Sequence, residues 1–343
     1  MKTRHTAVSM QGDRFLINGK LTYEGRYWNG HRIEGLLMNS RMIQGIFDDR
    51  NPRTAARWAY PDTGEWDAER NTREFIEHMP AWKEHGLLAF TIGLQGGSPE
   101  GYSELQPWHN SAFREDGSLD EAYMRRLERI LDRADELGMV VMLNYFYFGQ
   151  DRRFSGEAAI KQAVASATAW VVQRGYTNVM LDLVNECDYF HYTSDIMKEH
   201  RIHELLELAR LVSTALRPDT TLPIGSSFRG TAVPTNNAIA ASDFILIHGN
   251  AGNPVWASEQ IDMLRNRAAY RGQPIVNNED DHFDFDREVN HMAISVAKGV
   301  SWGFFDPGAS DYAEGYQCPP VNWGISSERK RQFFAKLKEI TGV

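Results

Sequence analysis

Short apolar runs alternate along this chain with longer segments in which apolar residues recur every three or four positions. The apolar runs predict buried strands, because a strand that is covered on both faces has no polar side. These runs are residues 42–47, 87–92, 139–143, 179–184, 222–225, 244–247, 274–276 and 300–305. The periodic segments predict amphipathic helices. They are residues 68–85, 122–134, 160–171, 202–212, 257–269, 287–297 and 328–340.

This alternation predicts an α/β fold, a single (β/α)8 TIM barrel that spans residues 1–343. A doubly wound open sheet is the alternative, but no Gly-x-Gly-x-x-Gly follows the first strand and no phosphate-binding loop is present. Asn18-Gly19 lies between apolar residues and predicts a β-hairpin within an N-terminal extension, residues 1–30. Polar and aromatic segments at 48–66 and 306–323 predict long loops after strands one and eight.

Composition narrows the classes of partner. The chain has 37 Lys and Arg against 46 Asp and Glu, a net charge of −9, which disfavours nucleic acid and anionic membranes as partners. Two cysteines, Cys187 and Cys318, are too few for a disulfide framework or a Cys-rich zinc site. No signal-like or membrane-spanning apolar run is present, so we expect a cytoplasmic protein, with homo-oligomerisation left open.

Two acidic residues stand where a barrel of this kind carries its chemistry, at the C-terminal ends of strands. Glu186 ends the predicted fourth strand and Glu279 ends the seventh, each directly after an asparagine. These strands face each other across the barrel mouth, so both carboxyls are expected in one cleft. Glycosidic cleavage needs such a pair, because one group protonates the leaving oxygen while the other meets the positive charge at the anomeric carbon.

Val184-Asn185-Glu186, the second glutamate at the end of strand seven and Trp302 on strand eight resemble clan A of the glycoside hydrolases. That clan contains cellulases, mannanases and β-galactosidases built on (β/α)8 barrels, and the resemblance runs from about residue 15 to 340. It implies a retaining enzyme without a cofactor or a metal, acting on an oligosaccharide or glycoside. Glu279 would be the nucleophile, Glu186 the general acid/base, and Asn185 the contact to the sugar 2-hydroxyl. Transfer to a second sugar is an alternative outcome to hydrolysis.

Three strand ends depart from the cellulase-like pattern. Thr91 stands where strand two of those families carries an arginine, and Phe146 or Tyr147 replaces a histidine on strand three. On strand six His248 matches, but Asn250 replaces the tyrosine that usually bonds the nucleophile. The candidates to supply that hydrogen bond are His282, Tyr147 and Tyr316. These departures leave the subfamily and the sugar open.

Other residues near the strand ends are candidate substrate contacts. Trp302 is interpreted as a platform for a sugar ring, with core packing as the alternative. The remaining candidates are Asn144, Tyr147, His248, Asn250, His282, Tyr316, Trp323 and Trp28.

Two other functions stay open at this point. A metal-dependent barrel hydrolase would draw its ligands from His248 and the acidic run 279–286, which also fits a solvated loop. Its candidate ligands are His248, Asp280, Asp281 and His282. The second alternative is a barrel that binds carbohydrate without cleaving it. The sequence leaves the sugar, the linkage, the anomer and the choice between exo and endo action open.

Overall fold

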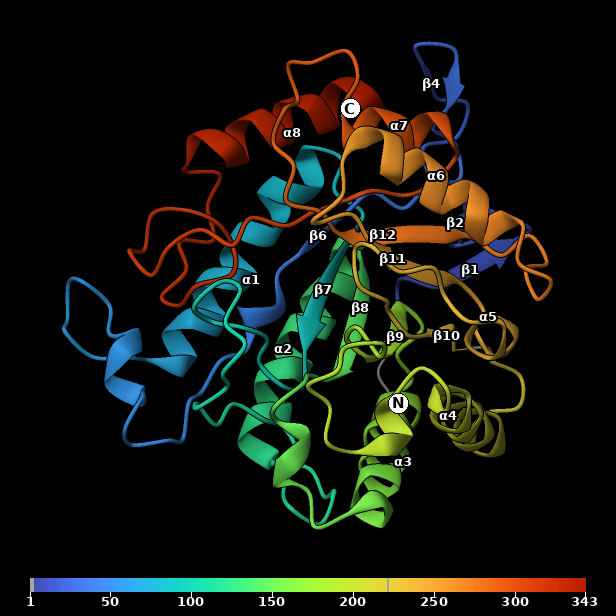
Figure 1. Cartoon of the computed structure of the whole chain (residues 1–343). Helices are drawn as coiled ribbons and strands as arrows, with labels where there is room; N and C mark the ends of the chain where they lie inside the picture. The colour runs from blue at the N-terminus through green and yellow to red at the C-terminus, as the bar shows by residue number, and fades with distance from the viewer. Residues whose placement is uncertain (1–2, 221) are drawn as a thin grey trace.

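A computed structural model describes residues 3–220 and 222–343 and confirms the (β/α)8 barrel (Figure 1). Within these residues the barrel strands are β6 (Asn39–Arg41), β7 (Ala89–Gly93), β8 (Val140–Phe146), β9 (Val179–Val184), β10 (Ile224–Gly225), β11 (Ile245–His248), β12 (Ile275–Glu279) and β13 (Gly303–Phe304). One parallel sheet runs β10-β9-β8-β7-β6-β13, and β11 pairs with β12. Parallel bridges join β12 to β13, and a hydrogen bond from Asp243 N to Ile224 O joins the start of β11 to β10, which closes the barrel.

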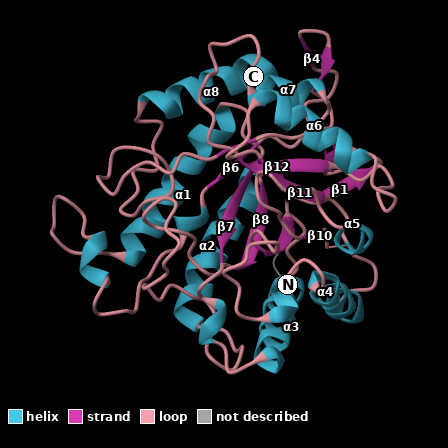
Figure 2. Ribbon diagram, viewed as in Figure 1, coloured by secondary structure: helices cyan, strands magenta, loops and turns pink. Residues whose placement is uncertain are grey.

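Helices form the outer layer around these strands (Figure 2). They are α1 (Ala68–Glu84), α2 (Glu121–Leu137), α3 (Glu157–Gln173), α4 (Ile202–Leu216), α5 (Asn236–Ala241), α6 (Pro254–Arg265), α7 (His291–Ala297) and α8 (Glu328–Thr341). The side chains of Asp67, Asp120 and Ser327 accept backbone N–H groups where α1, α2 and α8 begin. Apolar periodicity predicts all of these helices except α5, which is too short to show a period.

The first barrel strand lies earlier than its apolar run predicts. β6 is Asn39–Arg41, and the predicted strand at 42–47 instead contains a 3-10 turn, η1 (Ile43–Gly45). Ile43 and Ile46 are fully buried, so core packing rather than strand pairing accounts for the apolar pattern. The strand-end side chain is therefore that of Arg41.

The N-terminal segment covers the bottom of the barrel. Strands β1 (Val8–Gln11), β2 (Arg14–Ile17) and β3 (Lys20–Leu21) form an antiparallel sheet, and the predicted Asn18-Gly19 turn has positive φ at both residues. Val8 and Phe15 are buried in one apolar cluster with residues of the barrel strands. A second hairpin, β4 (Tyr27–Trp28) and β5 (His31–Arg32), follows.

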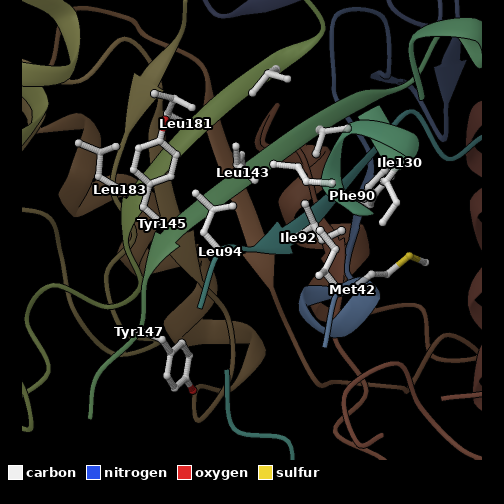
Figure 3. Packing of buried hydrophobic residues seen from close by; sticks show 14 of the residues in the cluster. Met42, Phe90, Ile92, Leu94, Ile130, Leu143, Tyr145, Tyr147, Leu181 and Leu183 are labelled. Carbon is white, nitrogen blue, oxygen red and sulfur yellow. The ribbon is translucent and has the colours of Figure 1, made fainter. Parts of the chain in front are cut away.

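The largest apolar cluster fills the space between the barrel and its helices. Phe90 and Ile92 of β7 lie beside Ile130 of α2 in this layer (Figure 3). Burial of a side chain of this size contributes roughly 1.5–3 kcal/mol, so the layer holds the strands in place. Tyr147 lies beyond the end of β8, apart from the other labelled side chains (Figure 3). It belongs to the site at the barrel mouth.

Long connections after β6, β7 and β13 gather on one side of the barrel (Figure 1). They include the predicted loops after the first and last strands, with the 3-10 turn η2 (Ala55–Trp58) in the first of these. Two further 3-10 turns, η3 (Asp151–Arg153) and η4 (Asp195–Met197), follow β8 and β9. Across residues 3–220 and 222–343, no helix has both the length and the apolar character needed to span a membrane.

Candidate active site

A cavity of about 280 Å³ opens at the C-terminal ends of the barrel strands. Its walls come from the segments that follow β7 to β11 and from the end of β12. The lining residues are Ser98, Tyr102, Ser103, Glu104, Tyr147, Phe148, Glu186, Tyr189, Arg229, Gly230, Thr231, Asn250, Ala251 and Glu279. The volume lies near the lower end of the range for small-ligand sites, roughly 300–1,000 Å³.

The two glutamates predicted from the sequence meet in this cavity. One carboxylate oxygen of Glu186 lies within 4.8 Å of one of Glu279. Between them, His248 Nδ1 lies 2.9 Å from Glu186 Oε1 and 3.4 Å from Glu279 Oε2. Parallel strands β9 and β12 end at the same edge of the barrel, and this brings residues 93 positions apart into one site.

Glu279 is surrounded by groups that stabilise negative charge. Arg41 Nε forms a buried ion pair with Glu279 Oε2 at 2.9 Å, and Asn250 Nδ2 donates a hydrogen bond to Glu279 Oε1 at 2.9 Å. Burial alone would lower the pKa of Arg41, but the charges of its acidic neighbours, Glu279 first among them, together outweigh burial and raise the pKa. Arg41 therefore stays positively charged beside this carboxylate.

The environment of Glu186, in contrast, disfavours negative charge. Burial raises the pKa of Glu186. The hydrogen bond and charge of His248 oppose this increase, and the charge of Glu279 adds to it. Its backbone has a φ of 50°, a left-handed conformation that costs a non-glycine residue about 1–3 kcal/mol. A hydrogen bond from Glu186 N to Ser227 Oγ, 3.1 Å long, helps to hold this conformation. The site thus favours a protonated Glu186 beside a charged Glu279.

A buried carboxyl lies beneath Glu186 on the same strand. Asp182 accepts hydrogen bonds from Ser227 N and Asn144 Nδ2, both at 3.0 Å. Burial raises the pKa of Asp182 to about 6. Asn144, predicted as a substrate contact, is fully buried and bonds to Asp182 instead of lining the cavity. It faces the interior because it lies within β8, before the strand reaches the mouth.

Arg41 belongs to the candidate site and is not among the residues predicted from the sequence. The expected arginine position is Thr91 on the second strand, but the arginine comes from the first strand, β6. Its Nη2 donates to Asn185 Oδ1 at 3.0 Å, so Arg41 contacts both Glu279 and the asparagine before Glu186. A correct start for the first strand would have identified it, because Arg41 is the last residue of β6.

Tyr147 and Asn250, both predicted as substrate contacts, line the cavity. Asn250 itself supplies the hydrogen bond to Glu279 that the sequence analysis assigns to Tyr147, His282 or Tyr316. Tyr147 OH lies 3.0 Å from Ser98 Oγ instead.

The predicted aromatic platforms lie elsewhere. Trp302, Tyr316 and Trp323 have no exposed surface and belong to the main apolar cluster. Trp302 packs against Phe333 of α8, so its core-packing alternative holds. Tyr316 and Trp323 stack on each other. Trp28 donates through Nε1 to Glu339 Oε1 on α8, away from the cavity lining. Packing of α8 over the strands buries Trp302, Tyr316 and Trp323 in the core. The positions of these residues in the sequence do not reveal this burial.

His282 belongs to a separate cluster behind Glu279. Its Nδ1 lies 2.7 Å from Asp280 Oδ1, and His291 Nδ1 lies 3.1 Å from Asp280 Oδ2. Burial would raise the pKa of Asp280, but the two histidines outweigh it and lower the pKa to about 2. Asn277 Nδ2 and Trp302 Nε1 also donate to Asp280 Oδ2, both at 2.9 Å. This carboxylate is saturated with donors and fixes the end of β12 next to Glu279.

Three residues that line the cavity could not be predicted from the hydrophobic pattern of the sequence, because they lie in loops. Tyr102 extends from the loop after β7, and its hydroxyl donates to Asp281. Tyr189 follows β9, and Arg229 follows β10. Arg229 Nε donates to Asp188 Oδ2 at 2.9 Å.

No protein-family model matches the chain, and no curated protein matches it. Solved structures share its fold. An endoglucanase from Bacteroides salanitronis, described as a GH5-4 enzyme of broad specificity, aligns with a TM-score of 0.59 at 10% identity, over 90% of this chain and 94% of its own. The β-glycosidase BGL167 aligns with a TM-score of 0.55 at 14% identity, over 89% and 95%. A β-mannanase from the blue mussel Mytilus edulis aligns with a TM-score of 0.53 at 10% identity, over 99% and 97%. At these identities the similarity establishes a common fold, the TIM barrel of these enzymes.

Proposed function

We propose that this protein is a retaining glycoside hydrolase, with Glu279 as nucleophile and Glu186 as general acid/base. The observation that carries the proposal is the approach of the two carboxyls within 4.8 Å in one cavity. Retaining glycosidases hold their carboxyls about 5–5.5 Å apart, whereas inverting enzymes keep them about 6.5–9.5 Å apart to admit a water molecule. The separation here supports the retaining arrangement.

In the first step a Glu279 oxygen attacks the anomeric carbon and the bond to the leaving oxygen breaks. Glu186 gives its proton to that oxygen, so the leaving group departs as a neutral alcohol. Arg41 and Asn250 hold the attacking carboxylate in place before the reaction. The product is a glycosyl ester on Glu279 and an ionised Glu186.

In the second step water attacks the anomeric carbon and Glu186 takes its proton. The ester has no charge, so the field of Glu279 no longer opposes ionisation of Glu186, and the same group serves as base. Cleavage of the ester returns Glu279 to its carboxylate and releases the sugar with its original anomeric configuration. A second sugar that occupies the place of water would give transfer instead of hydrolysis.

The substrate class we propose is an oligosaccharide or glycoside. Asn185 Oδ1 accepts from Arg41, which leaves its Nδ2 to donate to a sugar hydroxyl. Tyr147 and Asn250 add polar groups to the cavity wall. The similar structures, described as an endoglucanase, a β-glycosidase and a β-mannanase, agree with this class.

Glu279→Ala and Glu186→Ala test the assignment on a panel of nitrophenyl glycosides and oligosaccharides. Each variant should remain folded and lose several orders of magnitude in turnover. Azide should restore product formation in both, as the inverted glycosyl azide from Glu279→Ala and the retained one from Glu186→Ala. Near-wild-type turnover in either variant would rule out the assignment. Binding without turnover across the panel would favour the non-catalytic barrel.

The metal-dependent alternative is less well supported by the geometry. Its predicted ligands separate into two groups, because His248 lies between Glu186 and Glu279 while His282 contacts Asp280. Asp280 already accepts four side-chain hydrogen bonds, so a metal ion would have to displace them. Chelator-sensitive activity together with a stoichiometric metal would reverse this preference.

A further inference from the structure

A second hollow, of about 650 Å³, lies at the same end of the barrel, between the loops after β7 and β8. Its lining is basic, although the whole chain carries a net charge of −9. The cationic or potentially cationic side chains are Arg50, His109, Arg114, Arg152 and Arg153. Glu115 is the one acidic residue among the lining residues in the described part of the chain.

Two of these arginines are held in place and two have unused donors. Arg50 forms an ion pair with Asp120 at 2.9 Å, and Arg153 Nη2 donates to Trp108 O at 2.8 Å. Arg114 and Arg152 are exposed, and neither guanidinium has a hydrogen bond or ion pair within residues 3–220 and 222–343. Most arginines of this chain are paired, so two free guanidinium groups in one hollow are a local excess of positive charge.

The charge of this cluster also acts on its neighbours. Burial lowers the pKa of His109, and the charges of Arg153 and Arg50 lower it further. Burial likewise lowers the pKa of Arg153, and the charge of Arg152 adds to this effect. The hollow therefore has a positive potential that a bound anion would relieve.

A short chain of hydrogen bonds connects this hollow to the catalytic cavity. Gln106 lines the hollow, and its Nε2 donates to Ser98 Oγ at 3.1 Å. Ser98 and Tyr147 line the catalytic cavity, and their hydroxyl oxygens lie 3.0 Å apart. The two hollows are neighbours separated by a thin layer of side chains.

We propose that the basic hollow binds the carboxylate of an acidic sugar unit, so that the glycan acted on in the catalytic cavity is anionic. The choice of a sugar as the ligand rests on the proposed glycosidase function. The planar guanidinium groups of Arg114 and Arg152 match a carboxylate, which accepts two parallel N–H donors. Burial and the cationic neighbours of His109 both favour its neutral form, which offers a further hydrogen bond to a hydroxyl group.

Binding is measured with glucuronate, with glucose as its neutral counterpart and with inorganic sulfate as a sugar-free oxyanion. The readout is the arginine side-chain N–H spectrum of the full-length protein by NMR. Glucuronate should shift the Arg114 and Arg152 signals in a saturable way, and glucose should not. Arg114→Ala/Arg152→Ala should weaken glucuronate binding by about tenfold or more. The matched control is Arg73→Ala/Arg125→Ala, which removes two exposed, unpaired arginines from α1 and α2 and should change binding by less than about twofold.

Three results would overturn the proposal: no saturation with glucuronate, equal binding by the Arg114→Ala/Arg152→Ala variant, or binding of sulfate alone. Sulfate alone would mark a site for small oxyanions rather than for sugar acids. Glu186→Ala and Glu279→Ala should bind glucuronate in the hollow as the parent protein does. The binding assay therefore decides on the hollow independently of turnover, and failure of the glycoside panel would count against the catalytic proposal alone.

Discussion

Replacement of Glu279 by glutamine keeps the size of the side chain but removes its negative charge, and this should lower the pKa of Glu186. Glu279 raises that pKa in the parent protein because an ionised Glu186 would place two negative charges in one buried cavity. The variant also reproduces the charge of the proposed glycosyl-enzyme, in which the ester on residue 279 is neutral. It therefore tests whether one residue can serve as acid and then as base.

The magnitude follows from the geometry. Two unit charges 4.8 Å apart, which is the upper limit of the distance between the nearest carboxylate oxygens, interact by about 3.5 kcal/mol at an effective dielectric of about 20. His248 reduces this change, because the same charge on Glu279 also raises the pKa of His248. Without Glu279, His248 carries less positive charge and stabilises an ionised Glu186 less. We therefore expect the pKa of Glu186 to fall, by less than the direct interaction between the two carboxylates alone would give.

The assay is a titration of protein labelled with ¹³C at the glutamate carboxyl, followed by NMR. The Glu186 signal is assigned from its absence in Glu186→Gln. Glu104→Gln is the matched control, because Glu104 lines the same cavity but its side chain is 70% exposed, so solvent screens its charge. That control should leave the pKa of Glu186 nearly unchanged. An unchanged or higher pKa of Glu186 in Glu279→Gln would refute the electrostatic coupling on which the proposed two-step mechanism depends.

Three further variants test the geometry of the site. Asn250→Ala removes a hydrogen bond to the Glu279 carboxylate, and such a bond contributes about 1.5–3 kcal/mol. The value of kcat/KM should therefore fall about 10–100-fold in steady-state assays. Thr231→Ala, in the same cavity, is the control and should change kcat/KM little. Asp280→Asn leaves two histidines without their carboxylate and should lower the free energy of unfolding by about 3–5 kcal/mol in urea titrations. The pKa of Asp280 is about 2 in the folded protein and near 3.8 in the unfolded chain. The stabilising effect of Asp280 in the parent protein should therefore be complete above about pH 3.8 and be lost as the pH falls toward 2. An unfolding curve of Asp280→Asn that matches that of the parent protein would contradict this account. Trp302→Phe should lower Tm but leave KM within about twofold, because the Trp302 ring lies in the core. A large rise in KM with an unchanged Tm would instead place Trp302 at the substrate.

The two glutamates show how far strand ends can be identified from one sequence. Each follows a run of apolar residues, and the barrel rule then assigns both to the same mouth. The same rule did not identify Arg41, because β6 is short and its three residues, Asn39, Ser40 and Arg41, are polar. The apolar residues after it are buried by packing rather than by strand pairing. Because the predicted first strand was displaced by a few residues, the ion-pair partner of Glu279 was not identified.

The alternation of strands and helices and the positions of Glu186 and Glu279 can be predicted from the sequence alone, because apolar periodicity and burial on both faces of a strand are local properties of the chain. Which polar groups meet depends on the tertiary structure. It placed Trp302 and Tyr316 in the core, brought His291 from α7 to Asp280, and set Arg114 and Arg152 around one hollow. Contacts of this kind depend on how helices and loops from distant segments close over the strands, and no short stretch of sequence contains that information.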